Sequence, residues 1–207
     1  MKTRVKICGI TRMEDGVAAA RLGADAIGFV FYAASPRFTT ADRAREIAGA
    51  IPPFVSTVGL FVNADTSHVL EVLRHIRLDY LQFHGEESPA YCAQFGVPFL
   101  KAIRVKPGVD LLQYATSFSG AGALLLDAYV DGTHGGTGQR FDWQLIPANL
   151  PLPVILSGGL EPGNITSAVQ TVRPWAVDVS SGVEAAKGIK DAAKIERFIR
   201  GVRDADV

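Results

Sequence analysis

The feature that most constrains this chain is a regular alternation of short apolar runs with helical segments. Eight runs are rich in Val, Ile, Leu or Phe and too short for helices, as expected of strands that helices cover. They span residues 4–8, 26–31, 57–62, 80–84, 99–105, 123–127, 153–157 and 176–180. The first run alternates between polar and apolar residues, which gives a strand one apolar face and one polar face.

Helix signals fill the gaps between these runs. Thr11 to Glu14 fits a capping box, and Gly23 is placed to end the helix that follows. Further helices are expected over residues 41–50, 67–76, 89–95, 109–118, 141–146, 164–172 and 192–202. Eight strand–helix units without a long linker predict an α/β fold, a single (β/α)8 TIM barrel domain over residues 1–207. A doubly wound sheet is the alternative, but no Gly-x-Gly-x-x-Gly follows the first run.

Composition narrows the class of protein. With 207 residues and 48% hydrophobic residues, the chain is long enough for one sizeable core. Its formal net charge of zero argues against a nucleic-acid partner. Cys8 and Cys92 form no disulfide framework, and no cysteine or histidine spacing suggests a metal site. Without a signal segment or a long apolar run, we expect a cytoplasmic protein with no membrane partner.

Polar side chains at the strand ends are the candidates for chemistry, because barrel enzymes place their sites there. Cys8 ends the first run and is a candidate base or nucleophile, or else a small buried hydrophobe. Lys6 lies on the same face of that strand and is positioned to lower the pKa of the thiol from about 8.5. Cys92 falls in the fourth helix and is expected in the core.

Carboxylates and cationic side chains follow other strands. Asp127 comes directly after three leucines, where an unpaired carboxylate is costly, so it is either used in chemistry or held by a cap or ion pair. Arg37 suits a carboxylate or phosphate ligand, or lies solvated at the surface. Gln82 and His84 share one strand face, and His84 reads equally as a satisfied histidine. Asp178 either contacts substrate or braces a neighbouring lysine.

Three glycine-rich loops follow the sixth, seventh and eighth runs. They are residues 131–138, Ser157-Gly158-Gly159 and Ser181-Gly182. Each alone reads as an ordinary turn, but in a barrel they lie side by side. Backbone N–H groups in such loops can approach a phosphate closely. The sequence therefore predicts a phosphorylated small-molecule substrate held by Gly158, Gly159, Ser181 and Gly182.

The chain resembles the phosphoribosylanthranilate isomerase family. The matching stretches are Val5-Lys6-Ile7-Cys8-Gly9, Ser35-Pro36-Arg37, Gln82-Phe83-His84-Gly85, residues 135–138 with Phe141-Asp142-Trp143, Leu156-Ser157-Gly158-Gly159-Leu160, and Asp178-Val179-Ser180-Ser181-Gly182-Val183-Glu184. They span essentially the whole chain in the family's order. The resemblance implies a (β/α)8 barrel that carries out an Amadori rearrangement in tryptophan biosynthesis. N-(5-phosphoribosyl)anthranilate would become 1-(2-carboxyphenylamino)-1-deoxyribulose 5-phosphate.

By motif, the resemblance implies that Cys8 is the general base and Asp127 the general acid. It also implies that Arg37 holds the anthranilate carboxylate, with Gln82, His84 and Asp178 as further substrate-binding residues. An acid and an opposed base suffice for this reaction, so we expect no metal and no cofactor. The expected assembly is a monomer or a homodimer. Two alternatives remain: another phosphosugar isomerase or epimerase barrel, and a barrel that binds a phosphorylated ligand without turnover.

Overall fold

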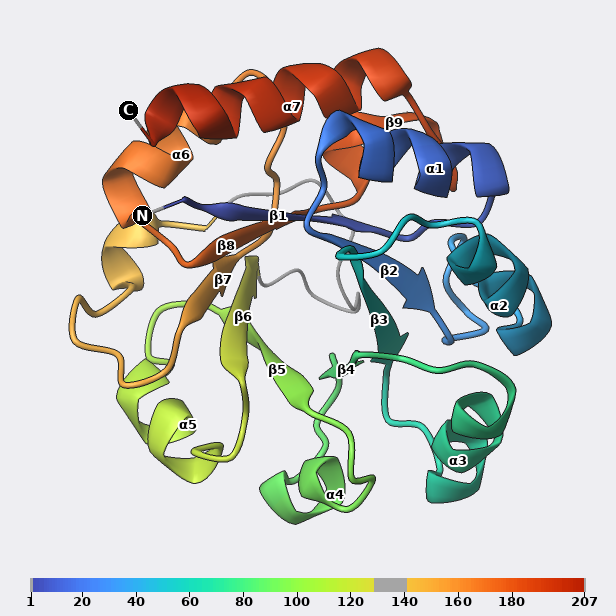
Figure 1. Ribbon diagram of the computed structural model, residues 1–207. Coiled ribbons are helices and arrows are strands. Elements are labelled where there is room, and N and C mark those ends of the chain that lie inside the picture. Colours follow the sequence, from blue (N-terminus) through green and yellow to red (C-terminus); the bar gives the residue numbers. More distant parts are fainter. Residues whose placement is uncertain (1, 129–140, 207) are drawn as a thin grey trace.

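The computed structural model describes residues 2–128 and 141–206 and contains a closed barrel of parallel strands. The strands pair in chain order, and β8 pairs with β1 to close the ring, as Figure 1 shows. Their bounds are β1 Arg4–Cys8, β2 Ala26–Val30, β3 Ser56–Phe61, β4 Tyr80–Phe83, β5 Phe99–Val105, β6 Ala123–Ala128, β7 Val154–Leu156 and β8 Ala176–Val179. The predicted barrel is confirmed, and the doubly wound alternative is wrong.

Helices surround the barrel (Figure 1). They are α1 Met13–Leu22, α2 Ala41–Gly49, α3 Thr66–His75, α4 Pro89–Ala93, α5 Leu111–Ser117, α6 Ile165–Val172 and α7 Ala192–Ala205. Two single-turn 3-10 helices, η1 Trp143–Leu145 and η2 Ser181–Val183, follow β6 and β8. A small hairpin of β9 Glu184–Ala186 and β10 Ile189–Lys190 lies between η2 and α7.

Local capping explains several helix starts and corrects one prediction. Thr40 and Ser88 accept backbone N–H bonds at the starts of α2 and α4, as Ser and Thr caps do. The predicted capping box at Thr11 is wrong, because Arg12 is the residue that precedes α1 and makes no side-chain cap. Thr11 Oγ1 instead donates to the carbonyl of Gly188 at 2.6 Å.

The sixth strand–helix unit also differs from expectation. Within residues 141–153, only η1 forms where a short helix over 141–146 is predicted. Asp142 caps this turn by accepting from the N–H of Gln144. Ile146 is extended, with φ −86° and ψ 113°, because a residue before proline avoids the helical region. Pro147 therefore limits the helix to the single turn η1.

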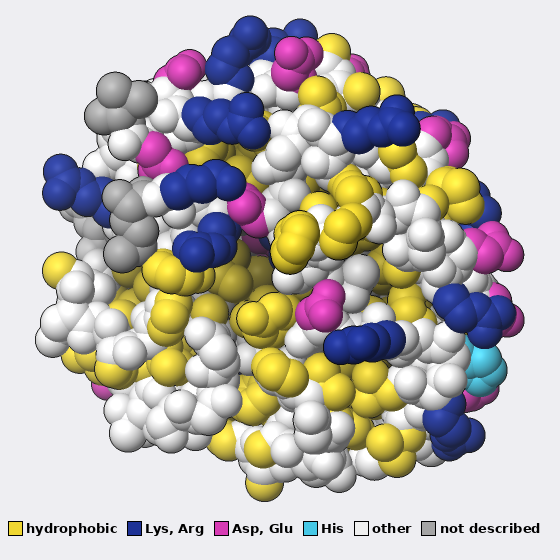
Figure 2. Space-filling model, in the orientation of Figure 1, with side chains coloured by type: hydrophobic (Ala, Val, Ile, Leu, Met, Phe, Trp, Pro, Cys, Tyr) yellow, Lys and Arg dark blue, Asp and Glu magenta, His cyan; other side chains and the backbone are white. Residues whose placement is uncertain are grey.

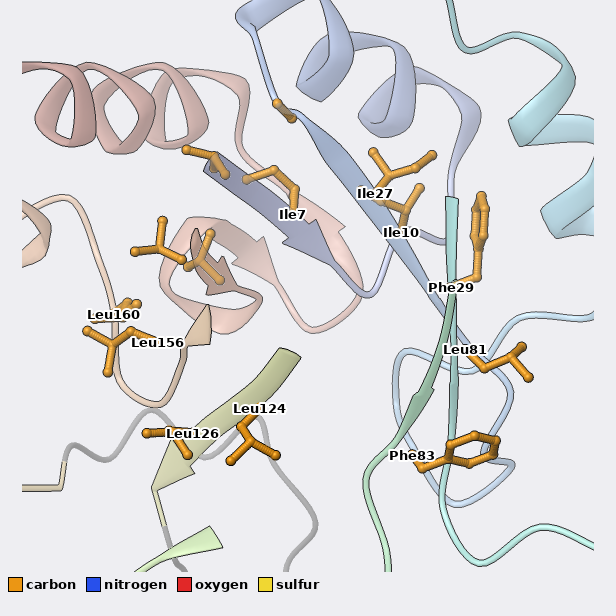
Figure 3. Close-up of a cluster of buried hydrophobic side chains, with 14 of the residues drawn as sticks. Ile7, Ile10, Ile27, Phe29, Leu81, Phe83, Leu124, Leu126, Leu156 and Leu160 are labelled. Carbon is orange, nitrogen blue, oxygen red and sulfur yellow. The ribbon is translucent and has the colours of Figure 1, made fainter. Parts of the chain in front are cut away.

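Alternating residues on each strand divide the core into two parts. Side chains on one face pack outward against the helices, and Figure 3 shows Leu81, Phe83, Leu124 and Leu126 among them. All four are fully buried. Burying one such side chain stabilises the fold by roughly 1.5–3 kcal/mol. The opposite face fills the barrel interior with a smaller apolar cluster: Val58, Leu100, Ala102, Ala123, Leu125, Ile155 and Ala176.

The outer surface is mixed in charge. Figure 2 shows Lys and Arg side chains gathered over the part of this face where α1 and α7 lie, with Asp and Glu side chains among them. A cavity of about 810 Å³ is lined in part by Thr3, Pro153 and Trp175, which directly precede β1, β7 and β8. No helix in the described ranges is both long and apolar enough to span a membrane.

Candidate active site

The inward-facing polar residues lie at the carboxyl ends of the strands. Cys8 is the last residue of β1, Asp127 the next to last of β6, and Asp178 lies in β8. Gln82 lies in β4, and His84 follows that strand directly. Each of these five residues is at most 5% exposed. The parallel ring therefore brings residues from four strands to one end of the barrel.

Strand register places Lys6 directly opposite Asp178. The two residues are paired between β1 and β8, and Lys6 Nζ lies 2.7 Å from Asp178 Oδ1. Ser157, which directly follows β7, donates from its Oγ to the second carboxylate oxygen at 3.4 Å. Asp178 thus braces a neighbouring lysine, one of the two roles that the sequence left open. Its proposed contact with substrate remains a prediction.

The Cys8 thiol has a raised pKa: Lys6 acts to lower it, as predicted, but does not set the net direction. Burial disfavours the thiolate most strongly, and the nearby Asp178 carboxylate adds to the rise. Lys6 and Lys190 act in the opposite direction, but their attraction is smaller than the burial effect. The burial has a structural source, because Cys8 packs in an apolar cluster with Val30, Leu60 and Val62.

Gly28 is a part of this site that the sequence analysis missed. It is paired with Cys8 in the register between β1 and β2. A Cβ added to Gly28 would lie 2.9 Å from Cys8 Sγ and 3.2 Å from Lys6 Nζ. A glycine in the middle of a strand commonly marks a place where another group approaches the backbone closely, and this feature of the sequence could have identified Gly28. Gly28 therefore leaves room for the thiol and the ammonium together.

A second group of side chains joins β4 to β6. His84 Nε2 lies 3.1 Å from Asp127 Oδ2, and Gln82 Nε2 lies 3.0 Å from His84 Nδ1. The other carboxylate oxygen, Asp127 Oδ1, accepts from the N–H of Ala128 at 2.8 Å. The structure thus brings three of the predicted residues into one hydrogen-bonded chain. Both oxygens of Asp127 have a donor that can stabilise a carboxylate.

Arg37 is held by a residue that the sequence analysis did not select. Its Nε and Nη2 bond both carboxylate oxygens of Glu184, at 2.7 and 2.8 Å, with both side chains buried. Lys190 Nζ binds the same carboxylate at 2.9 Å and also the carbonyl of Ser180 at 3.1 Å. Glu184 and Lys190 come from the β9–β10 hairpin after β8. Two buried cations therefore share one carboxylate, so this group of three carries one net positive charge.

Arg37 lies in the loop that follows β2. In the structure Arg37 lies beside the loop after β8: a Cβ on Gly9 would lie 2.6 Å from Arg37 Cδ and 3.1 Å from Ser180 Oγ. The reason is the closure of the ring, because β2 and β8 both neighbour β1.

Electrostatics within this group follow from burial and pairing. Burial disfavours the charged form of Glu184, but the Arg37 and Lys190 contacts outweigh it and lower its pKa. Hydrogen bonding to Glu184 raises the pKa of Arg37 against the effect of burial. Burial lowers the pKa of Lys190 despite the Glu184 carboxylate. For Lys6, burial is opposed by Asp178 and Cys8, and its pKa is raised.

The glycine loops after β7 and β8 touch, as predicted from their neighbouring strands. A Cβ on Gly182 would lie 1.9 Å from the carbonyl oxygen of Leu160, so only glycine fits there. Gly158 and Gly159 have φ of 85° and 63°. Within the described ranges, the N–H groups of Gly158, Gly159, Ser181 and Gly182 donate to no backbone carbonyl. The predicted loop 131–138 and the motif residues 135–138 lie outside the described residues.

Two further expectations concern cysteine and metal. Cys92 is fully buried in α4, as predicted, and burial raises its pKa to about 12. Among the residues that the structure describes, no group of three or more His, Cys, Asp and Glu side chains could hold a metal ion. The cavity of about 810 Å³ contains none of the candidate site residues in its lining.

Comparisons with known proteins place this chain in a family. A family model described as N-(5'-phosphoribosyl)anthranilate (PRA) isomerase matches residues 5–201. A relative named N-(5'-phosphoribosyl)anthranilate isomerase, from Nitrosospira multiformis, is 59% identical over 98% of this chain and 97% of its own length. The crystal structure of phosphoribosyl anthranilate isomerase from Thermotoga maritima is 40% identical, covers 98% of this chain and 99% of that one, and has a TM-score of 0.90.

Another similar structure contains a ligand. It is a phosphoribosyl anthranilate isomerase in complex with reduced 1-(o-carboxyphenylamino)-1-deoxyribulose 5-phosphate. It is 40% identical, covers 98% of this chain and 99% of that chain, and has a TM-score of 0.85.

Proposed function

Because this chain belongs to the N-(5'-phosphoribosyl)anthranilate isomerase family, we propose that Cys8 and Asp127 are the base and the acid of its reaction. The enzyme converts N-(5-phosphoribosyl)anthranilate to 1-(2-carboxyphenylamino)-1-deoxyribulose 5-phosphate, an Amadori rearrangement in tryptophan biosynthesis. One observation carries the assignment of roles. A thiol and a carboxyl group, both buried, project from non-adjacent strands into the same end of the barrel.

The first step opens the furanose ring. Protonated Asp127 gives its proton to the ring oxygen while the anthranilate nitrogen donates its electron pair to C1. The bond between C1 and the ring oxygen breaks, which leaves a Schiff base and a free C4 hydroxyl. After this transfer the Asp127 carboxylate is stabilised by the hydrogen bonds from His84 and Ala128.

The second step removes a proton from C2. The Cys8 thiolate takes this proton, and the electron pair of the C–H bond forms an enolamine that tautomerises to the product ketone. Since burial raises the pKa of Cys8, the thiolate is a minor species at neutral pH but a stronger base once formed. The nearby Lys6 ammonium offsets part of this cost.

The two ends of the substrate require different contacts. The group of Arg37, Glu184 and Lys190 carries one net positive charge, which complements the single carboxylate of anthranilate. Val30, Leu60 and Val62 pack beside Cys8 and offer an apolar wall for the aromatic ring. The N–H groups of the loops after β7 and β8 suit the phosphate. His84 and Asp178 are placed at this end of the barrel to contact the substrate, and Gln82 supports His84 through the bond between them.

Three further assignments accompany this function. The protein acts in the cytoplasm and assembles as a monomer or a homodimer. The chemistry needs only the acid, the base and the anthranilate nitrogen, so it proceeds with no metal and no cofactor. Light scattering of the purified protein measures the assembly directly.

Replacing the acid tests the proposed division of roles. Asp127→Asn keeps the shape of the side chain but removes the transferable proton, so it should lose about 10² to 10⁴ in rate on the cyclic substrate. A synthetic open-chain Schiff-base analogue bypasses ring opening and should be much less affected. Equal losses on both substrates would show that Asp127 does not act in the opening step.

A further inference from the structure

Gln82 contains a buried polar atom that the proposed mechanism does not use. The side chain is fully buried, and its Oε1 has no hydrogen-bond partner within the described part of the chain. Leaving such an atom unpaired costs about 1–3 kcal/mol. The amide nitrogen, in contrast, faces His84 Nδ1 at 3.0 Å. The orientation of this amide therefore favours His84 at the expense of Gln82 itself.

This orientation fixes the tautomer of His84. An amide nitrogen only donates, so His84 Nδ1 must be an acceptor and carries no proton. The ring proton then lies on Nε2, which faces Asp127 Oδ2 at 3.1 Å. Which nitrogen of a histidine carries the proton is set by the partner of the other nitrogen.

The tautomer in turn decides which oxygen of Asp127 carries the transferable proton. With Nε2–H donating to Oδ2, a proton on the protonated acid goes to Oδ1. A Cβ on Gly158 would lie 2.9 Å from Oδ1, so this oxygen borders the loop after β7. The N–H of Ala128 contacts Oδ1 and stabilises it once the proton has left.

The opposite amide orientation would give the opposite result. Gln82 Oε1 would accept a proton from His84 Nδ1, and the neutral ring would expose a lone pair at Nε2. A protonated Asp127 would then donate from Oδ2 to Nε2, and its proton would point at the histidine. The same three residues would hold the proton away from the loop after β7.

The other charged side chains near Gln82, His84 and Asp127 are already paired. On the neighbouring strand, Arg104 is in register with Asp127 and forms an ion pair with Glu86. Lys101 on the same strand pairs with Glu87 at 2.8 Å. Across the barrel, Lys6 pairs with Asp178 beside Cys8. Within the described residues, none of these groups forms a hydrogen bond to His84 that would replace the one from Gln82.

We propose that Gln82 is a positioning residue that holds His84 in the Nε2–H tautomer and thereby keeps the transferable proton of Asp127 on Oδ1. This inference rests on the proposed role of Asp127 as the general acid. Gln82 acts only through His84, so its loss should change kcat rather than the binding of substrate. When an imidazole that acts as the general base is held in the wrong tautomer, kcat falls by about 10⁴, which sets an upper bound for a histidine that acts through a neighbouring carboxyl group.

The direct test is nitrogen NMR of the histidine rings. The chain has 4 histidines, so the His84 signals can be assigned by comparison with His84→Asn. Wild type at neutral pH should show His84 with Nε2 protonated and Nδ1 bare. Gln82→Glu places an acceptor at Nδ1 and should move the proton there. A wild-type ring with the proton on Nδ1 would overturn the proposal without any measurement of activity.

Kinetics supply the second readout. Gln82→Glu should lower kcat at least roughly tenfold, with KM within about twofold of wild type. If the buried carboxylate prevents folding, Gln82→Met keeps the side-chain length and should give mixed tautomers with a smaller loss of kcat. Gln113→Glu, the same change on the exposed side of α5, is the matched control and should leave kcat and KM unchanged.

The outcomes separate this inference from the proposed function. If the tautomer changes in Gln82→Glu but kcat does not, or if Gln82→Met keeps one tautomer and full kcat, Gln82 is not a positioning residue. If His84 behaves as expected but Asp127→Asn keeps full turnover, the acid has been assigned to the wrong residue. Those two failures concern different measurements and cannot be confused.

Discussion

Glu184→Gln is the most informative perturbation of stability at this site. The carboxylate accepts three bonds of 2.7, 2.8 and 2.9 Å from two cations. The exposed fractions of the side chains are 10% for Arg37, 6% for Glu184 and 1% for Lys190. Removing one member of a buried ion pair costs about 3–5 kcal/mol, because the remaining charges stay buried without compensation. The neutral amide still accepts one of these bonds, so we expect a loss of about 3 kcal/mol.

Thermal unfolding measures this loss. For a chain of about this size, 1 kcal/mol shifts Tm by roughly 2–4 °C, so Glu184→Gln should lower Tm by roughly 6–12 °C. Glu46→Gln is a matched control, because Glu46 pairs with Arg43 at 2.9 Å but its side chain is 57% exposed. Breaking an exposed pair typically costs about 0–1 kcal/mol. The double variant Glu184→Gln/Lys190→Met removes one uncompensated ammonium and should recover part of the loss.

The pH dependence of this difference in Tm is a second, independent test of the prediction. The pKa of Glu184 is lowered in the folded protein, so its stabilisation is complete above the ordinary value of 4.5 and is lost as pH falls through the lower folded value. The difference in Tm between wild type and Glu184→Gln should therefore narrow as pH falls below 4.5. A difference no larger than that of Glu46→Gln, or one that stays constant down to acid pH, would refute the reasoning.

Three other outcomes follow from the geometry. Arg37→Ala should weaken inhibition by a product analogue by roughly 1.5–3 kcal/mol; an analogue that lacks the carboxylate should bind both proteins equally, and a mutant that still discriminates as wild type does would exclude this contact. Gly28→Ala should lower kcat roughly tenfold, because the new Cβ would displace Cys8 or Lys6. Circular dichroism should show that the variant is folded. An unchanged kcat would show that the exact positions of Cys8 and Lys6 are not critical. Alkylation followed by mass spectrometry should modify native Cys8 faster as pH rises above neutral, because its pKa is raised. The same reagent should modify Cys92, with a pKa of about 12, only after unfolding. Equal alkylation rates of Cys8 at pH 6 and pH 9 would contradict the raised pKa.

The barrel and the ends of its strands follow from the sequence because they depend on local patterns. Each strand is a short apolar run, and the predicted bounds of β1 and β5 match the structure. Cys8, His84 and Asp127 end or follow such runs, so their arrival at one end of the barrel could be predicted. The capping box predicted at the start of α1 does not form, because Thr11 instead bonds Gly188, a residue 177 positions away.

The partners of the site residues could not be predicted either, because these contacts also join residues that lie far apart in the sequence. Lys6 and Asp178 are separated by 172 positions, and Arg37 and Glu184 by 147. Only the closed ring brings β8 and its hairpin against β1 and the loop after β2. The raised pKa of Cys8 likewise depends on burial, which requires knowing what packs around the thiol. A pattern of residues shows which side chains reach the mouth but not which ones satisfy each other there.

Turnover of freshly made N-(5-phosphoribosyl)anthranilate tests the central assignment most directly. The fluorescence of this substrate should decay when the purified protein isomerises it without added metal. Cys8→Ser keeps the size of the side chain but forms little base at neutral pH, so it should lose about 10² to 10⁴ in kcat and still bind a product analogue. A Cys8→Ser enzyme whose fluorescence decay stays within a few-fold of wild type would contradict the account, because the proton at C2 would then be removed by another residue.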